Sequence, residues 1–230
     1  VLSSRSGLMS TSAVAAQSSA ATWSMICDAG DAVDTLTLLT HATFVGVLHA
    51  AGLLYDKMLR SMASGDVQAS FAPKALAASH VHTVVVGKHL ETLGLFSSIA
   101  STFGSVGHAN YAAANAYMDA LVRCRRSHGA LESSLQIPAV SGAGMSAITF
   151  GKEQLDAMGA ATLDEFASWL AYVLTPGSAG AERIQALLNP KLLDMVHTDA
   201  VFETQRGVAS APTCEEEALL AQQPSSLPQS

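Results

Sequence analysis

Short apolar runs alternate with stretches of helical character along most of the chain. The apolar runs predict β-strands over residues 1–4, 23–27, 44–49, 93–98, 135–140 and 183–188. The remaining stretches have helical spacing or helix-forming composition and predict helices over residues 8–22, 31–41, 66–82, 109–124 and 162–174. Strands that alternate with helices in this way predict an α/β fold with a doubly wound parallel sheet and helices on both faces.

Local signals refine some of these elements. Pro73 is awkward inside the helix over 66–82, and Pro138 requires its strand to end or kink. The three valines at 84–86 are strand-like by propensity, but the glycine and lysine that follow leave this segment ambiguous. Residues 162–165 read TLDE, a capping box that opens the last helix.

The composition changes near residue 203. Beyond that point proline, glutamine, serine and an acidic run at 215–217 dominate, which is typical of a solvated linker. We therefore divide the chain into a folded domain over residues 1–202 and a linker or tail over 203–230 that leads toward a further domain.

Small or polar residues follow four of the predicted strands. They are Arg5, Asp28, the Ala-Ala-Gly run at 50–52, and Ser98. In parallel sheets the strand ends that bind ligands lie along one edge, so these positions are expected to meet there.

The segment over 95–117 contains the candidate catalytic residues. Ser98 closes an apolar strand, Tyr111 follows on an alanine-rich helix, and Asn115 lies four residues after Tyr111 (115 − 111). The i, i+4 spacing places the phenol and the carboxamide on one helix face, one turn apart. A hydroxyl at a strand end that meets this phenol forms the core of a proton-delivery site.

Charge and composition exclude several classes of function. The net charge of −7 argues against non-specific binding to nucleic acid or to an anionic membrane. No apolar run reaches the roughly 18 residues that a membrane-spanning helix needs. The three cysteines are odd in number and widely spaced, so a reducing, cytoplasm-like compartment (or an organelle lumen of reducing character) is expected. No targeting signal and no tight metal-ligand cluster is visible.

With these residues in view, the sequence resembles the ketoreductase domain of modular polyketide synthases, a branch of the short-chain dehydrogenase/reductase superfamily. The matching segments lie in the family's order across residues 1–188: VLSSRSG (1–7), ICDAGD (26–31), GVLHAAGLLYDKML (46–59), FAPKALAA (71–78), LFSSIASTFGSVGHANYAAANAYMDAL (95–121) and LQIPAVSGAGM (135–145). The resemblance implies a Rossmann-like sheet.

The resemblance also implies that a unit is lacking. The family's first β-α unit carries the glycine-rich turn that cradles the cofactor's pyrophosphate, and it should precede Val1. The cofactor-free structural subdomain of the family is lacking as well. We therefore expect a piece of a longer protein, which by itself binds NADPH poorly or not at all and lacks activity.

The resemblance assigns four catalytic residues: Lys74, Ser98, Tyr111 and Asn115. Most short-chain dehydrogenases carry lysine four residues after the tyrosine, whereas here Asn115 stands there and Lys74 lies 24 residues before Ser98 (98 − 74). This exchange is typical of polyketide and fatty-acid ketoreductases. The implied reaction is the NADPH-dependent reduction of a β-keto group, on an acyl chain held by the phosphopantetheine of an acyl carrier protein, to a β-hydroxy group.

The implied roles follow the family. Tyr111 protonates the alkoxide, Ser98 hydrogen-bonds the carbonyl oxygen, and Lys74 and Asn115 support a proton relay through water. A tyrosine with a pKa of about 10 is a weak proton donor at neutral pH. The ammonium group of Lys74 is therefore expected to lower the pKa of Tyr111 toward the working pH.

The resemblance also assigns the cofactor contacts. Ser4 and Arg5 match the residues that recognise the adenosine 2′-phosphate, because a guanidinium group favours that dianion and thus NADPH. Asp28 matches the residue near the adenine. Ala50, Ala51 and Gly52 match the backbone that approaches the nicotinamide-side ribose.

Three positions bear on stereochemistry and substrate. The family's LDD motif is reduced here to its final residue, Asp56, and Phe103 stands where a tryptophan marks the opposite type. Asn110 agrees with the LDD pattern, although Val106 replaces its usual proline. This mixture favours the B-type, which gives the D-configured alcohol.

Plainer interpretations stay open for single residues. Arg5 can be a surface charge and Asp28 a loop residue or helix cap, and the histidines are core or surface side chains rather than metal ligands. For the whole chain, the alternatives are a catalytically inactive structural spacer between neighbouring synthase domains and a free-standing short-chain dehydrogenase. Retention of the four catalytic side chains favours the reductase.

Overall fold

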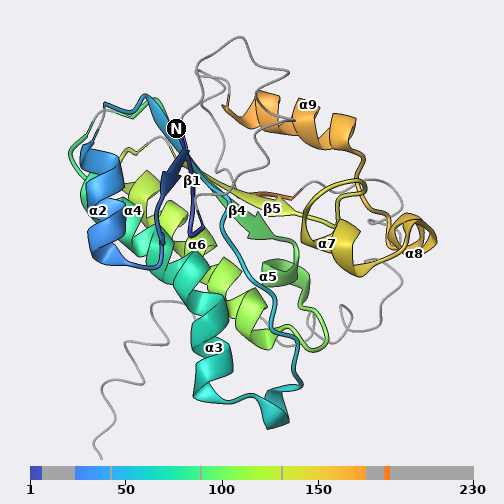
Figure 1. The fold of residues 1–230 in the computed structure, drawn as a ribbon. Coiled ribbons are helices and arrows are strands. Elements are labelled where there is room, and N and C mark those ends of the chain that lie inside the picture. The colour runs from blue at the N-terminus through green and yellow to red at the C-terminus, as the bar shows by residue number, and fades with distance from the viewer. Residues whose placement is uncertain (7–23, 42, 89, 131, 175–183, 187–230) are drawn as a thin grey trace, which may run out of the picture. The chain divides into compact units, whose positions relative to one another are not determined.

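The computed structural model describes residues 1–6, 24–41, 43–88, 90–130, 132–174 and 184–186 (Figure 1). These residues belong to one compact unit, Val1–Asn189. The predicted helix over 8–22 and the predicted boundary at residue 203 lie outside the described residues.

The described strands are all parallel and form two sheets. The first pairs β1 (Leu2–Ser4) with β2 (Ser24–Ile26). The second has the order β3-β4-β5-β6, with bounds Gly46–His49, Thr92–Ser98, Glu132–Ile137 and Ile184–Ala186. The predicted α/β fold is therefore confirmed, and its parallel sheet is present as two pieces.

The helices of the described part follow the strands in the expected alternation. They are α2 (Ala32–Thr40), α3 (Ser64–Phe71), α4 (Ala77–Val85), α5 (Ala100–Phe103), α6 (Ala109–Ser127), α7 (Gly144–Thr149), α8 (Lys152–Ala157) and α9 (Leu163–Leu174). A short 3₁₀ turn, η1 (Leu59–Ser61), precedes α3, and a π-helical turn, η2 (Ala72–Leu76), joins α3 to α4. No helix in the described ranges is long and apolar enough to cross a bilayer.

Alternating side chains of β4 bind helices to both faces of the larger sheet. Leu93 and Leu95 point to one face, where they join a core with Met118 and Val122 of α6 and with residues of α2 and α4. These three helices lie side by side in Figure 1. Phe96 points to the other face, where its ring meets Phe166 of α9 edge-on at 6.0 Å between centroids. Helices on both faces were predicted, and this arrangement confirms them.

Two segments of the chain differ from the prediction, and the first of them carries a site residue. The helix predicted over 66–82 is present, but Pro73 lies in a π-turn that divides it into α3 and α4. Proline has no N–H to donate, so the backbone ladder changes register at this point. Residues 84–86 do not form a strand, because α4 continues to Val85 and its buried face outweighs their β propensity.

The strand predicted over 135–140 is present with shifted bounds, and the predicted capping box is present as expected. Strand β5 begins at Glu132, earlier than predicted, and ends at Ile137, immediately before Pro138. The capping box at α9 is formed: the backbone N–H of Glu165 donates to the Thr162 hydroxyl, and the Glu165 carboxylate accepts from the Thr162 backbone at 2.8 Å.

Candidate active site

Ser98 is the last residue of β4 and lies where the chain turns into α5. Its side-chain oxygen accepts a hydrogen bond from the backbone N–H of Ala100 at 3.2 Å, and only 9% of the residue is exposed. Ser101 donates to the Ser98 carbonyl oxygen at 2.8 Å. The hydroxyl group is therefore fixed at the carboxyl end of the strand, as the sequence predicts.

Tyr111 and Asn115 lie one turn apart on α6, next to Ser98. The Asn115 amide donates to the backbone carbonyl of Tyr111 at 2.8 Å, and hydrogen bonding by the side chains of Ser98 and Asn115 acts to lower the pKa of the Tyr111 phenol. Asn115 is fully buried, and its Oδ1 has no hydrogen-bond partner within the described residues. Such an orphan acceptor is a suitable anchor for a water molecule.

Lys74 enters the same site from the π-turn η2. Its Nζ lies 5.2 Å from the centre of the Tyr111 ring and donates to the carbonyl oxygen of Phe96 at 2.8 Å. The π-turn makes this possible, since it displaces residue 74 from the regular helix ladder. The structure thus brings together all four predicted catalytic side chains.

His49, the last residue of β3, secures the π-turn from the sheet. Its Nε2 lies 3.3 Å from the carbonyl oxygen of Lys74, and it also hydrogen-bonds the backbone of Pro73. Burial, and next the charge of Lys74, lower the pKa of His49 to about 4. The ring is therefore neutral at physiological pH and can donate to a carbonyl group of the turn.

Burial dominates the electrostatics of the site. It lowers the pKa of Lys74 from 10.5 to about 8, and the negative charge of Asp119 acts in the opposite direction. Burial also raises the pKa of Tyr111, which outweighs the hydrogen bonds from Ser98 and Asn115. The expectation that Lys74 lowers the pKa of Tyr111 below its ordinary value is therefore wrong for this arrangement. The phenol keeps its proton at neutral pH.

The predicted cofactor residues form two groups. In the first, the pairing of β1 with β2 places Ser4 beside Ile26, and the Cys27 backbone N–H donates to the Ser4 carbonyl oxygen at 3.1 Å. Arg5 directly follows β1, Asp28 lies two residues after the end of β2, and both are exposed. The Asp28 carboxylate accepts from the Gly30 backbone at 2.9 Å, so it also shapes its own turn.

The second group is the backbone after β3. Ala50 and Ala51 are exposed, whereas Gly52 lies against the side chain of Lys74. The segment predicted to approach the nicotinamide-side ribose is therefore also a neighbour of Lys74, a predicted catalytic residue.

Two of the three predicted stereocontrol residues, Asp56 and Asn110, lie at the start of α6 or contact it. Asp56 forms an ion pair with Nε2 of His108 at 3.0 Å, and the His108 ring lies edge-on to Tyr111 with 6.2 Å between centroids. Asn110 is buried and donates to the carbonyl oxygen of Tyr55 at 3.1 Å. Phe103 ends α5 and is half-buried.

Sequence reasoning missed His49, His108 and Asp119. The histidines were considered only as core or surface side chains, and Asp119 was not considered. One signal was available for Asp119, because it lies four residues after Asn115 (119 − 115) and thus on the helix face of the site.

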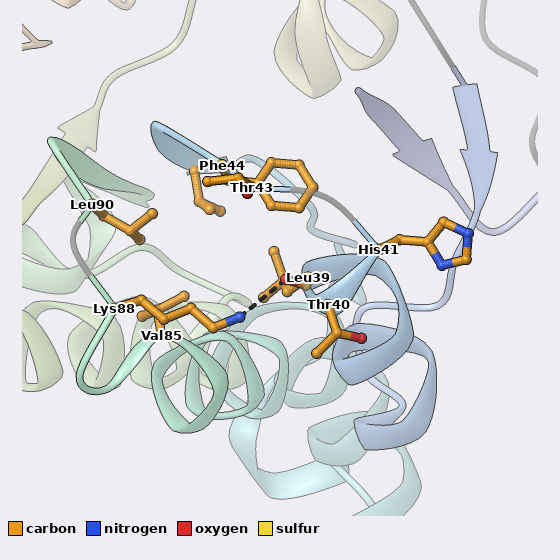
Figure 2. A pocket seen from close by; sticks show the side chains of 9 residues that line it. Leu39, Thr40, His41, Thr43, Phe44, Val85, Lys88 and Leu90 are labelled. Atoms are coloured by element: carbon orange, nitrogen blue, oxygen red, sulfur yellow. Dashed lines mark hydrogen bonds between the residues drawn. The ribbon is translucent and has the colours of Figure 1, made fainter.

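A cavity of about 600 Å³ lies at the opposite, amino-terminal end of β3. Figure 2 shows its lining, from Leu39, Thr40 and His41 at the end of α2 to Phe44, Val85, Lys88 and Leu90. Its lysine is engaged, because Nζ of Lys88 donates to the Leu39 carbonyl oxygen at 3.1 Å. Its lining contains none of the four predicted catalytic side chains, so we place the candidate site at the carboxyl ends of the strands despite the size of this cavity.

Comparisons with known proteins agree with this site. Residues 1–142 match the family model of the KR domain. The chain is 47% identical over 90 residues to the polyketide synthase GfsA of Streptomyces halstedii, which is 39% of this chain and 1% of that protein. It is 34% identical over 151 residues to the 6-methylsalicylic acid synthase of Penicillium terrestre, which is 64% of this chain and 8% of that protein. The chain thus spans a small part of these multidomain relatives.

A solved structure of A-type ketoreductases from a modular polyketide synthase has the same fold. It superposes with a TM-score of 0.66 at 29% identity and covers 75% of this chain and 38% of that one. KR domains of polyketide synthases are oxidoreductases of the Rossmann-like short-chain dehydrogenase type, and such domains bind nicotinamide cofactors. The family model matches more than half of the chain, and the structure assembles the expected lysine, serine, tyrosine and asparagine. This chain therefore belongs to the KR domain family, the ketoreductases of polyketide synthases.

Proposed function

We propose that this chain is the catalytic part of an NADPH-dependent β-ketoacyl reductase in a multidomain synthase. Its substrate is a β-keto thioester carried by the phosphopantetheine of an acyl carrier protein, and its product is the β-hydroxy thioester. The observation that carries the proposal is the convergence of Ser98 and Asn115 on the Tyr111 phenol, with the Lys74 ammonium group over the same ring.

Tyr111 is the proton donor. Burial raises its pKa, so the phenol is protonated at neutral pH and can give its proton to an alkoxide that forms beside it. Ser98 supplies a hydroxyl donor where negative charge develops on the carbonyl oxygen. Such a donor is typically worth about 3–4 kcal/mol of transition-state stabilisation.

Lys74 and Asn115 prepare the return of the proton. With a pKa of about 8, Lys74 is mostly protonated at pH 7 and can still exchange its proton there. The orphan Oδ1 of Asn115 is an acceptor for a water molecule within the site. A water molecule at this oxygen would connect the phenol to the lysine and then to solvent.

NADPH would supply the hydride for the carbonyl carbon. Ser4 offers a buried hydroxyl oxygen without a partner among the described residues, and the exposed Arg5 follows it. A hydroxyl and a guanidinium group at the end of a strand fit the adenosine 2′-phosphate. Asp28 would lie at the adenine, and the backbone at 50–52 would lie at the nicotinamide-side ribose.

The acyl chain would enter past Asp56 and Phe103, with Asn110 fixing the adjoining loop to α6. We propose B-type stereochemistry, which gives the D-configured alcohol. The other partners would be neighbouring synthase domains, as in the multidomain relatives. A cytoplasmic or similarly reducing location agrees with the free thiols of Cys27 and Cys124.

The test follows NADPH absorbance with a β-keto thioester or with trans-1-decalone. It uses this chain and an extended chain, defined here as this chain preceded by a glycine-rich β-α unit of a polyketide synthase ketoreductase. We expect the extended chain to bind NADPH more tightly and to form the D-alcohol. A folded extended chain without turnover would favour the spacer. Formation of the L-alcohol would overturn the stereochemical assignment alone.

A further inference from the structure

Asp119 is a buried acid beneath the proposed site. It lies on α6 two turns after Tyr111 and one turn after Asn115, and only 3% of the residue is exposed. Carboxylates are almost never buried to this degree unless they are paired or fully hydrogen-bonded. Hydrogen-bond donors are therefore expected around this carboxylate.

Hydrogen-bond donors from two other elements meet its carboxylate. Oδ2 accepts from the Ser101 hydroxyl at 2.7 Å and from the Gln136 amide at 2.8 Å, and Oδ1 accepts from the Ser134 hydroxyl. Ser134 and Gln136 are two residues apart on β5 and so point to the same face of the sheet. The acid thus joins α6 to the sheet and to α5.

The network leads directly to the catalytic serine. The Ser101 oxygen lies 2.8 Å from the Ser98 carbonyl oxygen and 2.9 Å from the Gln136 amide. A serine hydroxyl has one hydrogen, whereas the amide has two. Gln136 can therefore donate to Asp119 and to Ser101 together, whereas the single hydrogen of Ser101 serves either the Asp119 carboxylate or the Ser98 carbonyl oxygen at any one time. Through these contacts the carboxylate and Gln136 hold the Ser101 oxygen beside the backbone of Ser98 at the end of β4.

The charge of Asp119 also acts on Lys74. Among the described residues, the Lys74 ammonium group donates to the Phe96 carbonyl of β4 and lies over the Tyr111 ring of α6, while Gly52 lies against its side chain and His49 of β3 against its backbone carbonyl. The charge of Asp119 on α6 acts on it as well. Of these, the carboxylate acts to raise the pKa of the lysine, against the larger effect of burial. It therefore favours the ammonium form.

We propose that Asp119 is a positioning residue of this site: its carboxylate holds Ser98 in register with Tyr111 through Ser101 and Gln136, and its charge acts on the ammonium group of Lys74. This proposal rests on the reductase function proposed above. It predicts that loss of the charge changes the pH dependence of the site, which loss of a purely structural contact does not do.

The test compares Asp119→Asn with Ser134→Ala, which removes one donor but leaves the charge. In the extended chain, reduction should lose rate as Lys74 deprotonates. For Asp119→Asn this alkaline limb should move to lower pH by roughly half to one unit, as expected for a charge removed from a partly screened site. The rate constant kcat should also fall about tenfold. Ser134→Ala should leave the limb in place. An unmoved limb in a folded Asp119→Asn variant overturns the proposal.

A second readout needs no turnover. The Lys74 side chain is titrated by NMR after ¹³C labelling of the lysines, in this chain and in the extended chain, and its signal is identified by its loss in Lys74→Met. A lower Lys74 pKa in Asp119→Asn supports the proposal even if no ketone is reduced, in which case only the reductase function fails. An unchanged pKa overturns it.

A third variant serves if Asp119→Asn does not fold. Ser101→Ala keeps the carboxylate and its other donors but removes the link to Ser98. It should lower kcat at least several-fold while the KM for NADPH and the alkaline limb stay unchanged. A kcat equal to that of the parent protein overturns the positioning role.

Discussion

Gly52 and Lys74 are in contact. A Cβ atom built on Gly52 would lie 2.8 Å from Cε of the lysine, closer than real Cβ atoms approach a neighbour, and 3.4 Å from its Nζ. The absence of a side chain at residue 52 therefore leaves the space that the end of Lys74 occupies. The family resemblance predicts that this glycine lies at the cofactor, and the structure adds that it makes room for the proposed catalytic lysine.

We predict that Gly52→Ala displaces the lysine and lowers kcat. A misplacement near 1 Å can cost about 100-fold, so we expect a loss of about 10- to 100-fold in the extended chain, measured by NADPH absorbance with trans-1-decalone. Gly65→Ala is the matched control, because a Cβ there meets nothing within 4 Å. It lies in α3 and should keep full activity and gain about 0.5–1 kcal/mol of stability. Equal activities of the two variants would contradict the spatial role of Gly52.

Lys74→Met should stabilise the protein while it abolishes activity. Burial lowers the lysine pKa from 10.5 to about 8, so holding the charge inside opposes folding at pH 7 by about 3 kcal/mol. Loss of the hydrogen bond to the Phe96 carbonyl offsets about 1 kcal/mol of the gain. We expect a net increase of about 1–3 kcal/mol in the free energy of unfolding, measured by urea denaturation.

The stability gain of Lys74→Met should also depend on pH. Between pH 8 and 10.5 the unfolded chain holds more protons on Lys74 than the folded one, so parent stability rises with pH in this window. The advantage of Lys74→Met should therefore shrink from pH 8 to pH 10.5. An advantage that stays constant over this range would mean that the pKa of Lys74 is the same in the folded and the unfolded protein, and so is not lowered by burial.

Much of this site could be predicted from the sequence, since it depends on local spacing. The strand that ends at Ser98, the helix with Tyr111 and Asn115 one turn apart, and the strand–helix alternation all follow from periodicity. The place of Lys74 was known only by resemblance, because its contact with Tyr111 spans distant segments and needs the π-turn at Pro73. No propensity predicts the register of such a turn.

The other features that the sequence does not predict also depend on contacts between distant segments. The pKa of Tyr111 depends on how deeply the assembled site is buried, which a sequence does not give. The Asp119 network joins two strand residues to two helices, and single-residue patterns do not reveal such convergence. The valines at 84–86 are strand-like by propensity, but α4 continues to Val85, which is buried against β4 and α6, a tertiary contact that propensity does not show.

His49 should make the protein acid-sensitive. Its pKa is about 4 when folded and near 6.5 when unfolded, so its contribution is complete above pH 6.5 and is lost as the pH falls toward 4. The loss should approach about 3 kcal/mol, at about 1.4 kcal/mol per pH unit. Urea denaturation from pH 7 to 4 measures it, with His49→Gln as the comparison, since glutamine retains an N–H donor but does not titrate. Parallel curves for the two proteins would contradict the buried neutral histidine.

Asn110 should be needed for stability at the entrance of the site. Its amide reaches the carbonyl oxygens of Tyr55 and Asp66, each at 3.1 Å, and its own oxygen accepts from the Tyr111 backbone at 2.9 Å. Asn110→Ala leaves these buried groups unpaired and should cost about 2–4 kcal/mol. Thermal unfolding measures the cost, and limited proteolysis should show faster cleavage in the loop between β3 and η1. A cost under about 1 kcal/mol would show that water replaces the amide.

The most direct measurement compares two tyrosines of the same helix. Tyr111 is the proposed proton donor, whereas the Tyr117 hydroxyl bonds Ser79 at 2.6 Å on an exposed face. Each is changed to phenylalanine in the extended chain, and NADPH-dependent reduction of a β-keto thioester is followed. The account predicts that Tyr111→Phe loses at least about 100-fold in kcat, the low end of general-acid contributions, with KM for NADPH unchanged, while Tyr117→Phe keeps parent activity. Equal turnover by the two variants would contradict the assignment of Tyr111 as the proton donor.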